Sequence, residues 1–325
     1  MSATVSLNLV LEETADTRSI PSVNEVKVTD LNLFAYYSRT GQLAEYAYIE
    51  NPGNSVEFSI NSGTGHDIYA IANTGDLTDS PGITDSLGLI ALAWKLDSPQ
   101  DIVNIEGAIP MSGMLRDVDV SNGSQFTIPL TRLLSKFRII ADTSGLDKDI
   151  TTFDIKKVMI RNMNRQTGYF RPARATAEDQ VFSEGLSLEG EELDALFSSG
   201  VDFYLPENAQ GDLLSSNIDE KTHIPPAPYD GLCTFVELHV DYRSSEHYND
   251  SLVYRYYLHD GRRLDNFDLL RNTMYTCQTH FTGTGINEQT WRIDVSGMKD
   301  LVTSITVSPS EKTFRDAGST FRFSA

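Results

Sequence analysis

The residues best suited to metal chemistry are an acidic segment and six histidines. Residues 117–123 read Asp-Val-Asp-Val-Ser-Asn-Gly and resemble a calcium loop, but an EF-hand needs Gly at the sixth position and Glu at the twelfth, where this chain has Asn122 and Ile128. The plainer interpretation is a β-hairpin that turns at Asn-Gly. Only His239 and His247 flank one expected hairpin, and a cross-strand metal site needs further ligands. The sequence predicts no metal site.

Nucleophilic catalysis finds no better support. Cys233 and Cys277 both lie in expected strands, where a disulfide and two buried free thiols are equally compatible with the sequence. A G-x-S-x-G elbow is absent. Carboxylates are abundant enough for any glycosidase pair to be proposed, but they are typical of a solvated acidic surface. We therefore predict no catalytic residue and no cofactor.

The composition excludes several classes of binding partner and of protein. The 325 residues include 26 Lys and Arg against 46 Asp and Glu, a formal charge of −20, with 40% hydrophobic residues. This is a globular composition. The acid excess argues against nucleic acid as a partner and against docking on anionic lipid through a basic face. No window approaches the ~20 apolar residues of a membrane-spanning helix.

Period-two alternation of apolar residues dominates the chain and predicts β-strands. The first strand places Val5, Leu7, Leu9 and Leu11 on one face. Many short strands follow, separated by Gly, Pro, Asn and Asp, as is typical of β-sandwiches. Two segments, 86–96 and 189–197, favour short helices. The expected fold is therefore all-β, with two tandem sandwich domains and one or two short helices.

Length and patterning suggest where these domains divide. Pro129 is the candidate boundary, which gives an N-terminal sandwich over residues 1–129 and a C-terminal sandwich over residues 130–300. Residues 301–325 form an extension in which Leu301, Ile305 and Val307 lie on an alternating apolar strand. Such a strand needs a partner, which could be this chain, a further domain or another subunit.

Arg18 follows the first strand in a polar segment that we expect to be accessible to proteases. Cleavage there would free residues 5–11 from the rest of the chain. The alternative is an ordinary loop arginine.

Several segments, in the same order along the chain, resemble the fimbrillin superfamily, which supplies the stalk, anchor and tip subunits of Bacteroidales type V pili. The clearest is an apolar strand followed by 267–275, Phe-Asp-Leu-Leu-Arg-Asn-Thr-Met-Tyr, which is similar to the family's late signature. The other matching segments are 72–76 (Ala-Asn-Thr-Gly-Asp), 109–113 (Ile-Pro-Met-Ser-Gly), 129–136 (Pro-Leu-Thr-Arg-Leu-Leu-Ser-Lys) and the Thr17-Arg18 pair.

This resemblance implies two transthyretin-like Greek-key sandwiches and an exported lipoprotein precursor. It also implies that an arginine-specific protease cuts after Arg18, that the outermost strand with Val5, Leu7 and Leu9 is displaced, and that a strand of the next subunit fills the groove. The candidate donor carries Leu301, Ile305 and Val307. The implied partners are other fimbrial subunits and host or bacterial surface ligands.

Two features depart from the family pattern. The chain has no lipidated Cys near Met1 and no signal peptide, as expected if the export signal was removed, so the membrane is a partner only through a lipid anchor that this chain lacks. Residues 304–325 also resemble the opening of a bacterial immunoglobulin-like module, in which case they are not a donor strand and the protein is a tip or accessory protein. Anchor subunits keep their first strand, and Arg18 would then be uncut.

The sequence therefore predicts a non-enzymatic fimbrial subunit of tip or accessory/anchor type, located in the fimbrium at the cell outer membrane. We expect it to assemble by strand exchange and to contribute to adhesion. One alternative is a surface lipoprotein that binds glycans through the tyrosines of its strands, and another is a glycosidase, which needs two carboxylates about 5–10 Å apart in a pocket. The strand tyrosines are Tyr36, Tyr37, Tyr46, Tyr48, Tyr254, Tyr256 and Tyr257.

Overall fold

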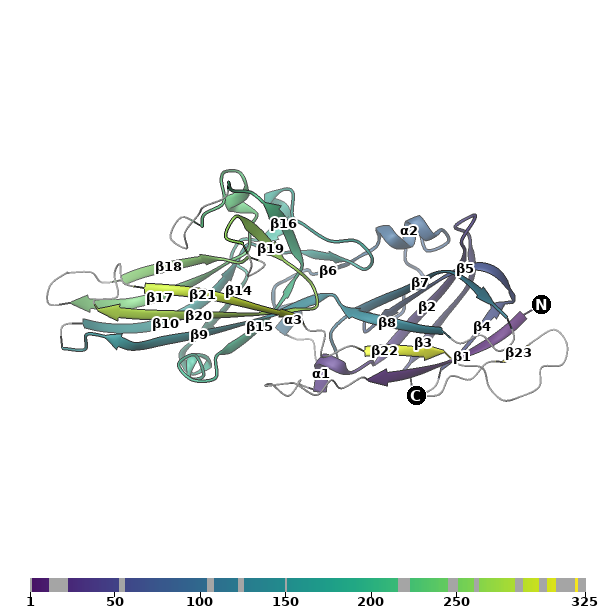
Figure 1. The fold of residues 1–325 in the computed structure, drawn as a ribbon, viewed down its shortest axis with the longest axis horizontal. Coiled ribbons are helices and arrows are strands. Elements are labelled where there is room, and N and C mark those ends of the chain that lie inside the picture. The colour runs from purple at the N-terminus through teal and green to yellow at the C-terminus, as the bar shows by residue number, and fades with distance from the viewer. Residues whose placement is uncertain are drawn as a thin grey trace.

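The structure is a computed structural model in which strands outnumber helices throughout (Figure 1). Its α-helices are one or two turns long: α1 (Val23–Val26), α2 (Ser86–Ala91) and α3 (Gln100–Val103). The expected all-β class is confirmed. The structure describes residues 2–11, 23–52, 56–103, 108–121, 126–149, 151–215, 223–244, 251–259, 263–283, 289–297, 303–307 and 319–320.

The N-terminal strands form two layers joined by one shared strand. One layer has the order β3 (Leu43–Glu50), β2 (Asp30–Tyr37), β5 (Gly63–Ala72) and β7 (Met111–Val120). The other layer has the order β4 (Val56–Asn61), β1 (Ser2–Leu11), β22 (Thr303–Val307) and β8 (Phe126–Arg132), with β23 (Ser319–Thr320) also on β1. Alternating side chains of the described strands pack between the layers, among them Leu33, Phe58, Ala70, Met111 and Ile128.

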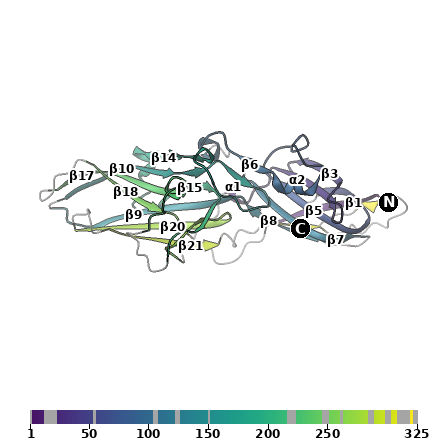
Figure 2. The ribbon, with the colours of Figure 1, turned by 90° about the horizontal axis from the view of Figure 1, so that it is seen from above.

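The C-terminal strands form a second pair of sheets around the largest apolar cluster. One sheet has the order β14 (Leu186–Glu189), β10 (Thr151–Arg161), β17 (Phe235–Ser244) and β18 (Ser251–Tyr257). The other has the order β15 (Val201–Pro206), β9 (Leu134–Leu146), β20 (Thr273–Gly283) and β21 (Gln289–Gly297). The two groups lie end to end in an elongated molecule, as the two perpendicular views show (Figures 1 and 2).

Three two-stranded pieces complete the fold. They pair β11 (Met163–Asn164) with β13 (Val181–Phe182), β12 (Gln166–Gly168) with β6 (Ala93–Lys95), and β16 (Asn208–Asp212) with β19 (Asn266–Leu269). The β6–β12 pair joins the two halves of the chain. Short 3-10 helices occur at η1 (Glu178–Gln180), η2 (Gly190–Leu193) and η4 (Tyr229–Gly231).

Two helix expectations were too long. The segment 86–96 is helical only to Ala91, because its second half pairs as β6 with β12. In the segment 189–197, Glu189 is the last residue of β14, and the residues after it form the 3-10 helix η2 rather than an α-helix. In the described part of the chain, no helix has the length and apolarity needed to cross a membrane.

The expected hairpin over 117–123 also needs correction. β7 and β8 are antiparallel, but among the described residues they pair only at Met111–Arg132 and Ser112–Thr131, and the earlier part of β8, residues 126–130, pairs with β22. The two strands still lie close together next to these pairs, since a Cβ on Gly113 would lie 2.2 Å from the carbonyl oxygen of Pro129. Asn122 and Gly123 lie outside the described residues.

Pro129 lies inside β8, and the strand continues to Arg132 in the N-terminal layer before β9 begins at Leu134. The two-domain division over 1–129, 130–300 and 301–325 remains a prediction. A segment near the C-terminus nevertheless pairs with N-terminal strands, since β22 lies between β1 and β8.

Candidate functional site

The first strand is enclosed by neighbours on both edges. β4 pairs with one edge of β1, from Ser2–Asn61 to Leu7–Val56. β22 and β23 pair with the other edge, β22 antiparallel and β23 parallel. The expectation that the first strand is outermost is therefore wrong. The reason is that the chain's own C-terminal strand returns to cover the edge that would otherwise stay open (Figure 1).

The register places the displaced strand and the candidate donor on one core-facing row of positions. Leu7 stands opposite Val56 on one side and Val307 on the other. Leu9 stands opposite Ile305, which in turn stands opposite Ile128, and Ile128 is fully buried. Opposed positions in antiparallel strands share a face of the sheet. Both predicted apolar patterns therefore have the same parity as the core. The remaining described members of the two predicted sets are Val5, which stands opposite Phe58, and Leu11, which stands opposite Thr303.

Arg18 and Leu301 lie outside the described residues. The described chain resumes at α1, which is docked where the two groups of sheets meet. Glu25 is 1% exposed. Its carboxylate accepts a hydrogen bond from Lys136 Nζ at 2.7 Å and another from the Tyr204 hydroxyl. Its carbonyl oxygen accepts from Arg132 Nε at 2.6 Å.

The cations around Glu25 are themselves enclosed. Burial lowers the pKa of Arg132 to about 10, while Glu25 and Tyr204 act in the opposite direction. Lys136 also lies 3.2 Å from Asp202, which accepts a bidentate pair of hydrogen bonds from Arg138. Burial opposes ionisation of Asp202, but these cations outweigh it and lower the pKa of that carboxyl group. The site therefore holds a chain of alternating charges.

Just beyond α1, a loop amide holds the backbone. Asn73 has φ +63° and donates from Nδ2 to the carbonyl oxygens of Lys27 (2.9 Å) and Ile109 (2.7 Å). Its Oδ1 accepts from the Thr29 backbone N–H at 2.8 Å. Asp30 in turn accepts from the backbone of residues 74 and 75. The segment 72–76 thus binds the chain that leads from α1 into β2.

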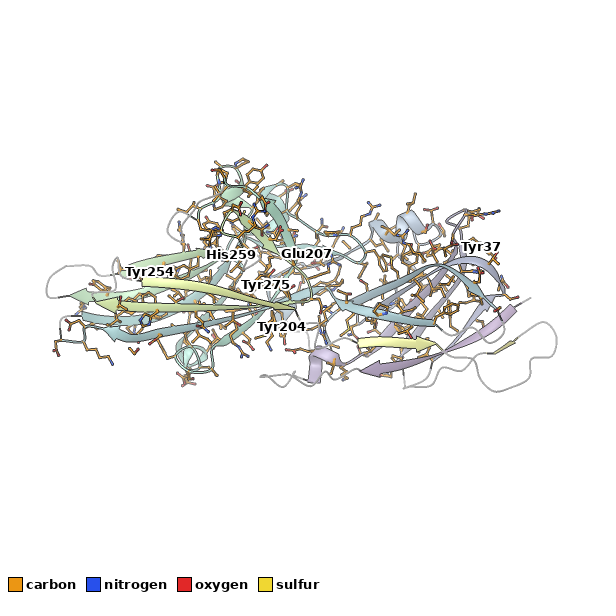
Figure 3. The ribbon with its side chains drawn as sticks, viewed as in Figure 1. Tyr37, Tyr204, Glu207, Tyr254, His259 and Tyr275 are labelled. Carbon is orange, nitrogen blue, oxygen red and sulfur yellow. The ribbon has the colours of Figure 1, made fainter. Side chains whose placement is uncertain are left out.

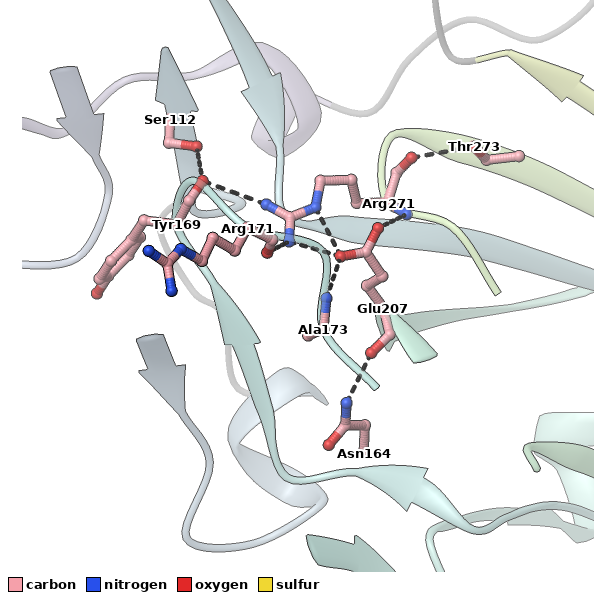
Figure 4. A network of polar contacts seen from close by, with 8 residues as sticks. All are labelled: Ser112, Asn164, Tyr169, Arg171, Ala173, Glu207, Arg271 and Thr273. Carbon is pink, nitrogen blue, oxygen red and sulfur yellow. Dashed lines mark hydrogen bonds and ion pairs between the residues drawn. The ribbon is translucent and has the colours of Figure 1, made fainter. Parts of the chain in front are cut away.

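A second polar network, formed by Glu207 and Arg271, clasps the C-terminal sheets to β7 (Figure 4). Arg271 Nε donates to Glu207 Oε2 at 2.9 Å, and its Nη atoms donate to the carbonyl oxygens of Tyr169 (3.2 Å) and Arg171 (2.7 Å). The Tyr169 carbonyl also accepts from the Ser112 hydroxyl. Figure 3 labels Glu207 and Tyr204 near the middle of the molecule.

The segments behind the family resemblance meet at this junction. Asn73 comes from 72–76, Ser112 from 109–113, Arg132 and Lys136 from 129–136, and Arg271 from 267–275. Sequence reasoning recognised these segments but missed Glu25 and Glu207. Neither stands in a motif, and each acquires its role only through contacts with residues far along the chain.

An open pocket of about 360 Å³ lies beside the Glu207–Arg271 ion pair. Its lining includes the Glu207–Arg271 pair together with Met114, Pro129, Phe170 and Pro172. Glu207 is the sole carboxylate among the described lining residues, and Arg271 engages it. The pocket therefore lacks the carboxylate pair that glycosidase chemistry needs. In the described part of the chain, no three His, Cys, Asp or Glu side chains gather as a metal site.

The two cysteines are free and buried. Cys233 packs with Phe235 and Phe267, whereas Cys277 lies in the main C-terminal core. Burial raises the pKa of both thiols to about 12, so neither is an active nucleophile. The structure agrees with the second of the two sequence interpretations, buried free thiols, rather than with a disulfide.

Most of the strand tyrosines are packed rather than displayed. Tyr36, Tyr254, Tyr256 and Tyr257 are at most 8% exposed. Tyr37 is 37% exposed, while Tyr46 and Tyr48 are half-buried. The Tyr46 hydroxyl donates to Asn32 or Asp76. Most of these tyrosines are therefore buried in the core and are not available to bind a glycan.

Comparison with known proteins agrees with this architecture. Residues 203–279 match the family described as "Domain of unknown function (DUF4906)". No curated protein matches the chain.

Solved structures cover nearly its full length. A candidate cell adhesion protein from Parabacteroides distasonis is 14% identical with a TM-score of 0.61, over 91% of this chain and 97% of that one. A fimbrilin from Porphyromonas gingivalis is 13% identical with a TM-score of 0.61, and the match covers 91% of this chain and 97% of the fimbrilin. The tip fimbrial protein Mfa3 from the same organism, with a C-terminal truncation, is 15% identical with a TM-score of 0.59, over 91% and 100%. The chain therefore has the fold of the fimbrilin and of the two other proteins named here.

Proposed function

We propose that this protein is a non-enzymatic, cell-surface fimbrial subunit of tip or accessory/anchor type. In this proposal it assembles with other fimbrial subunits by strand exchange, is exported to the outer membrane as a lipoprotein, and contributes to adhesion to host or bacterial surfaces. The fold shared with fimbrilins supports the general role. The observation that carries the exchange is the pairing of β1 with β22.

This pairing supports exchange because one exchanged strand can replace another without loss of backbone hydrogen bonds. Removal of β1 would leave β4 and β22 separated by one strand, a gap of about 10 Å at ~4.8 Å per strand. A strand from another subunit that fills this gap restores both hydrogen-bond ladders. Burial of four aliphatic side chains, the number that β1 carries on one face, contributes about 6–12 kcal/mol before ordering costs. This is enough for a stable filament joint.

Two events must precede strand exchange in this proposal: cleavage between β1 and α1, and the release of β22 from its own sheet. β1 is followed by residues 12–22, which include Arg18, so a single cut there would separate β1 from α1. The candidate donor, β22, lies in its own sheet and must leave it before it can enter a neighbour. We infer that the uncut monomer is the closed, non-polymerising state.

The test is digestion of the folded protein with an arginine-specific protease. We expect a new N-terminus at Ser19, identified by N-terminal sequencing, and a ladder of SDS-resistant oligomers. The matched control is Arg18→Ala, which removes the cut and leaves the strands unchanged. Cleavage only after unfolding, or an equal ladder from Arg18→Ala, would overturn the exchange proposal.

A further inference from the structure

The first described segment after the candidate cleavage site is fixed to the body of the molecule at both ends. Upstream, the Glu25 carboxylate is bound by Lys136 of β9 and Tyr204 of β15, and its carbonyl oxygen by Arg132 of β8. Downstream, Asn73 binds the backbone on both sides of Val28, at the Lys27 carbonyl oxygen and the Thr29 amide. We call residues 23–29 the strap.

The upstream contact behaves as a pin because both of its charges are withdrawn from water. The Glu25 side chain is 2% exposed and that of Lys136 is 11% exposed. A buried ion pair that loses one partner leaves the other charge unsatisfied, so release of α1 is strongly opposed. Lys136 would keep Asp202 at 3.2 Å, but Tyr204 and Arg132 would lose the contacts to Glu25 that are described here.

We propose that the strap, with Glu25 as its pin, limits strand exchange to the residues that precede Val23. A cut at position 18 would then release β1 while α1 and β2 stay in place. Glu25 is a positioning residue in this proposal, since it holds the chain and touches no exchanged strand in the described structure. The role in exchange rests on the proposed function, whereas the pinned geometry does not.

A lysine in the strap reports on the pin directly. Lys27 is exposed, but a protease must draw several residues on either side of the cut into an extended conformation. With the pin intact, we expect a lysine-specific protease to cut the folded protein slowly after Lys27. Glu25→Ala should increase the rate of that cut at least tenfold, and Glu25→Gln, which keeps hydrogen bonds but no charge, should increase it less.

Controls separate local release from unfolding. Lys157 lies in β10, a strand paired on both edges and apart from Glu25, so cleavage there measures global opening in the same digest. Glu45→Ala removes an exposed glutamate from β3 and should leave the rate at Lys27 unchanged. If Glu25→Ala does not fold, Asn73→Ala tests the downstream end of the strap and should also accelerate the cut at Lys27.

The outcomes are distinct for the two proposals. Rapid cleavage after Lys27 in the unaltered protein, or no acceleration in any strap variant, overturns the strap. Protection of Lys27 that depends on Glu25, without any ladder after cleavage at Arg18, supports the strap and overturns the exchange. A ladder of oligomers, together with equal rates of cleavage after Lys27 in all variants, supports the exchange and overturns the strap.

Discussion

Arg271 explains in physical terms why a short motif builds a junction. Its planar guanidinium reaches a carboxylate 64 residues away in the sequence and two carbonyl oxygens that are 102 and 100 residues away. The flanking residues add contacts: the Thr273 hydroxyl donates to the Arg271 carbonyl oxygen, and the Tyr275 hydroxyl accepts from the Leu270 amide. A lysine has neither the shape nor the number of donors to do the same.

Replacement of Arg271 should therefore weaken the whole fold. Arg271→Ala leaves the Glu207 carboxylate, 4% exposed, without its cation, and we expect a loss of about 3–5 kcal/mol in the free energy of unfolding. Arg271→Lys should recover part of this loss. The matched control, Lys156→Ala, removes an exposed partner of Asp154 and should leave the urea midpoint almost unchanged, because a solvated ion pair is screened by water. Urea unfolding measures the stability of all three variants. Equal midpoints for Arg271→Ala and Lys156→Ala would contradict a stabilising role for the Glu207–Arg271 ion pair.

At the scale of elements, the important fact is that β22 is paired rather than free. β22 has partners on both edges in its own chain, and β1 has partners on both of its edges. An exchange therefore has to break pairing before it can make new pairing. This argues for a kinetic barrier that proteolysis removes, since cleavage turns β1 into a separate peptide.

A disulfide between β1 and β22 tests whether these strands must separate. Leu9 and Ile305 are directly opposed, and Cα atoms of such pairs lie about 4.5–5.5 Å apart, within the range that a disulfide spans. We expect oxidised Leu9→Cys/Ile305→Cys protein to form no ladder after cleavage at Arg18. Reduction should restore the ladder, which makes the same sample its own control. An undiminished ladder from the oxidised protein would show that the strands need not part.

At the scale of the whole molecule, each group of sheets contains a buried histidine that resists protonation. His66 is 1% exposed in β5, and His223 is 2% exposed and stacks on Phe267 with ring centroids 4.3 Å apart. Burial lowers the pKa of both rings below the ordinary value of 6.5. The unfolded chain consequently binds more protons than the folded chain below that pH.

Stability should therefore be fully present above pH about 6.5 and should decline as the pH falls toward the lowered folded values. Thermal unfolding between neutral and mildly acidic pH measures this slope. His223→Phe keeps an aromatic ring against Phe267 but cannot titrate, so it should flatten part of the pH dependence. An unchanged slope would mean that other groups cause the acid sensitivity.

The amino-acid sequence by itself determined the class of fold and the parity of its strands. Alternation placed Leu7, Leu9 and Ile305 on the positions that the register aligns with the core, because a strand's side-chain period is two whatever its partners are. Motif residues such as Arg271 and Asn73 could also be recognised, because they stand in short segments that resemble the family, although their contacts are with residues far along the chain.

Only the tertiary structure decided which strands meet and which charges are buried. The pairing of β22 with β1 joins residues about three hundred positions apart, and the pin joins Glu25 to Lys136 and Tyr204. Nothing in the local pattern distinguishes Glu25 from the other 45 acidic residues. Its role depends on burial, which is a property of the packed chain, and burial turns an ordinary surface charge into a fixed contact.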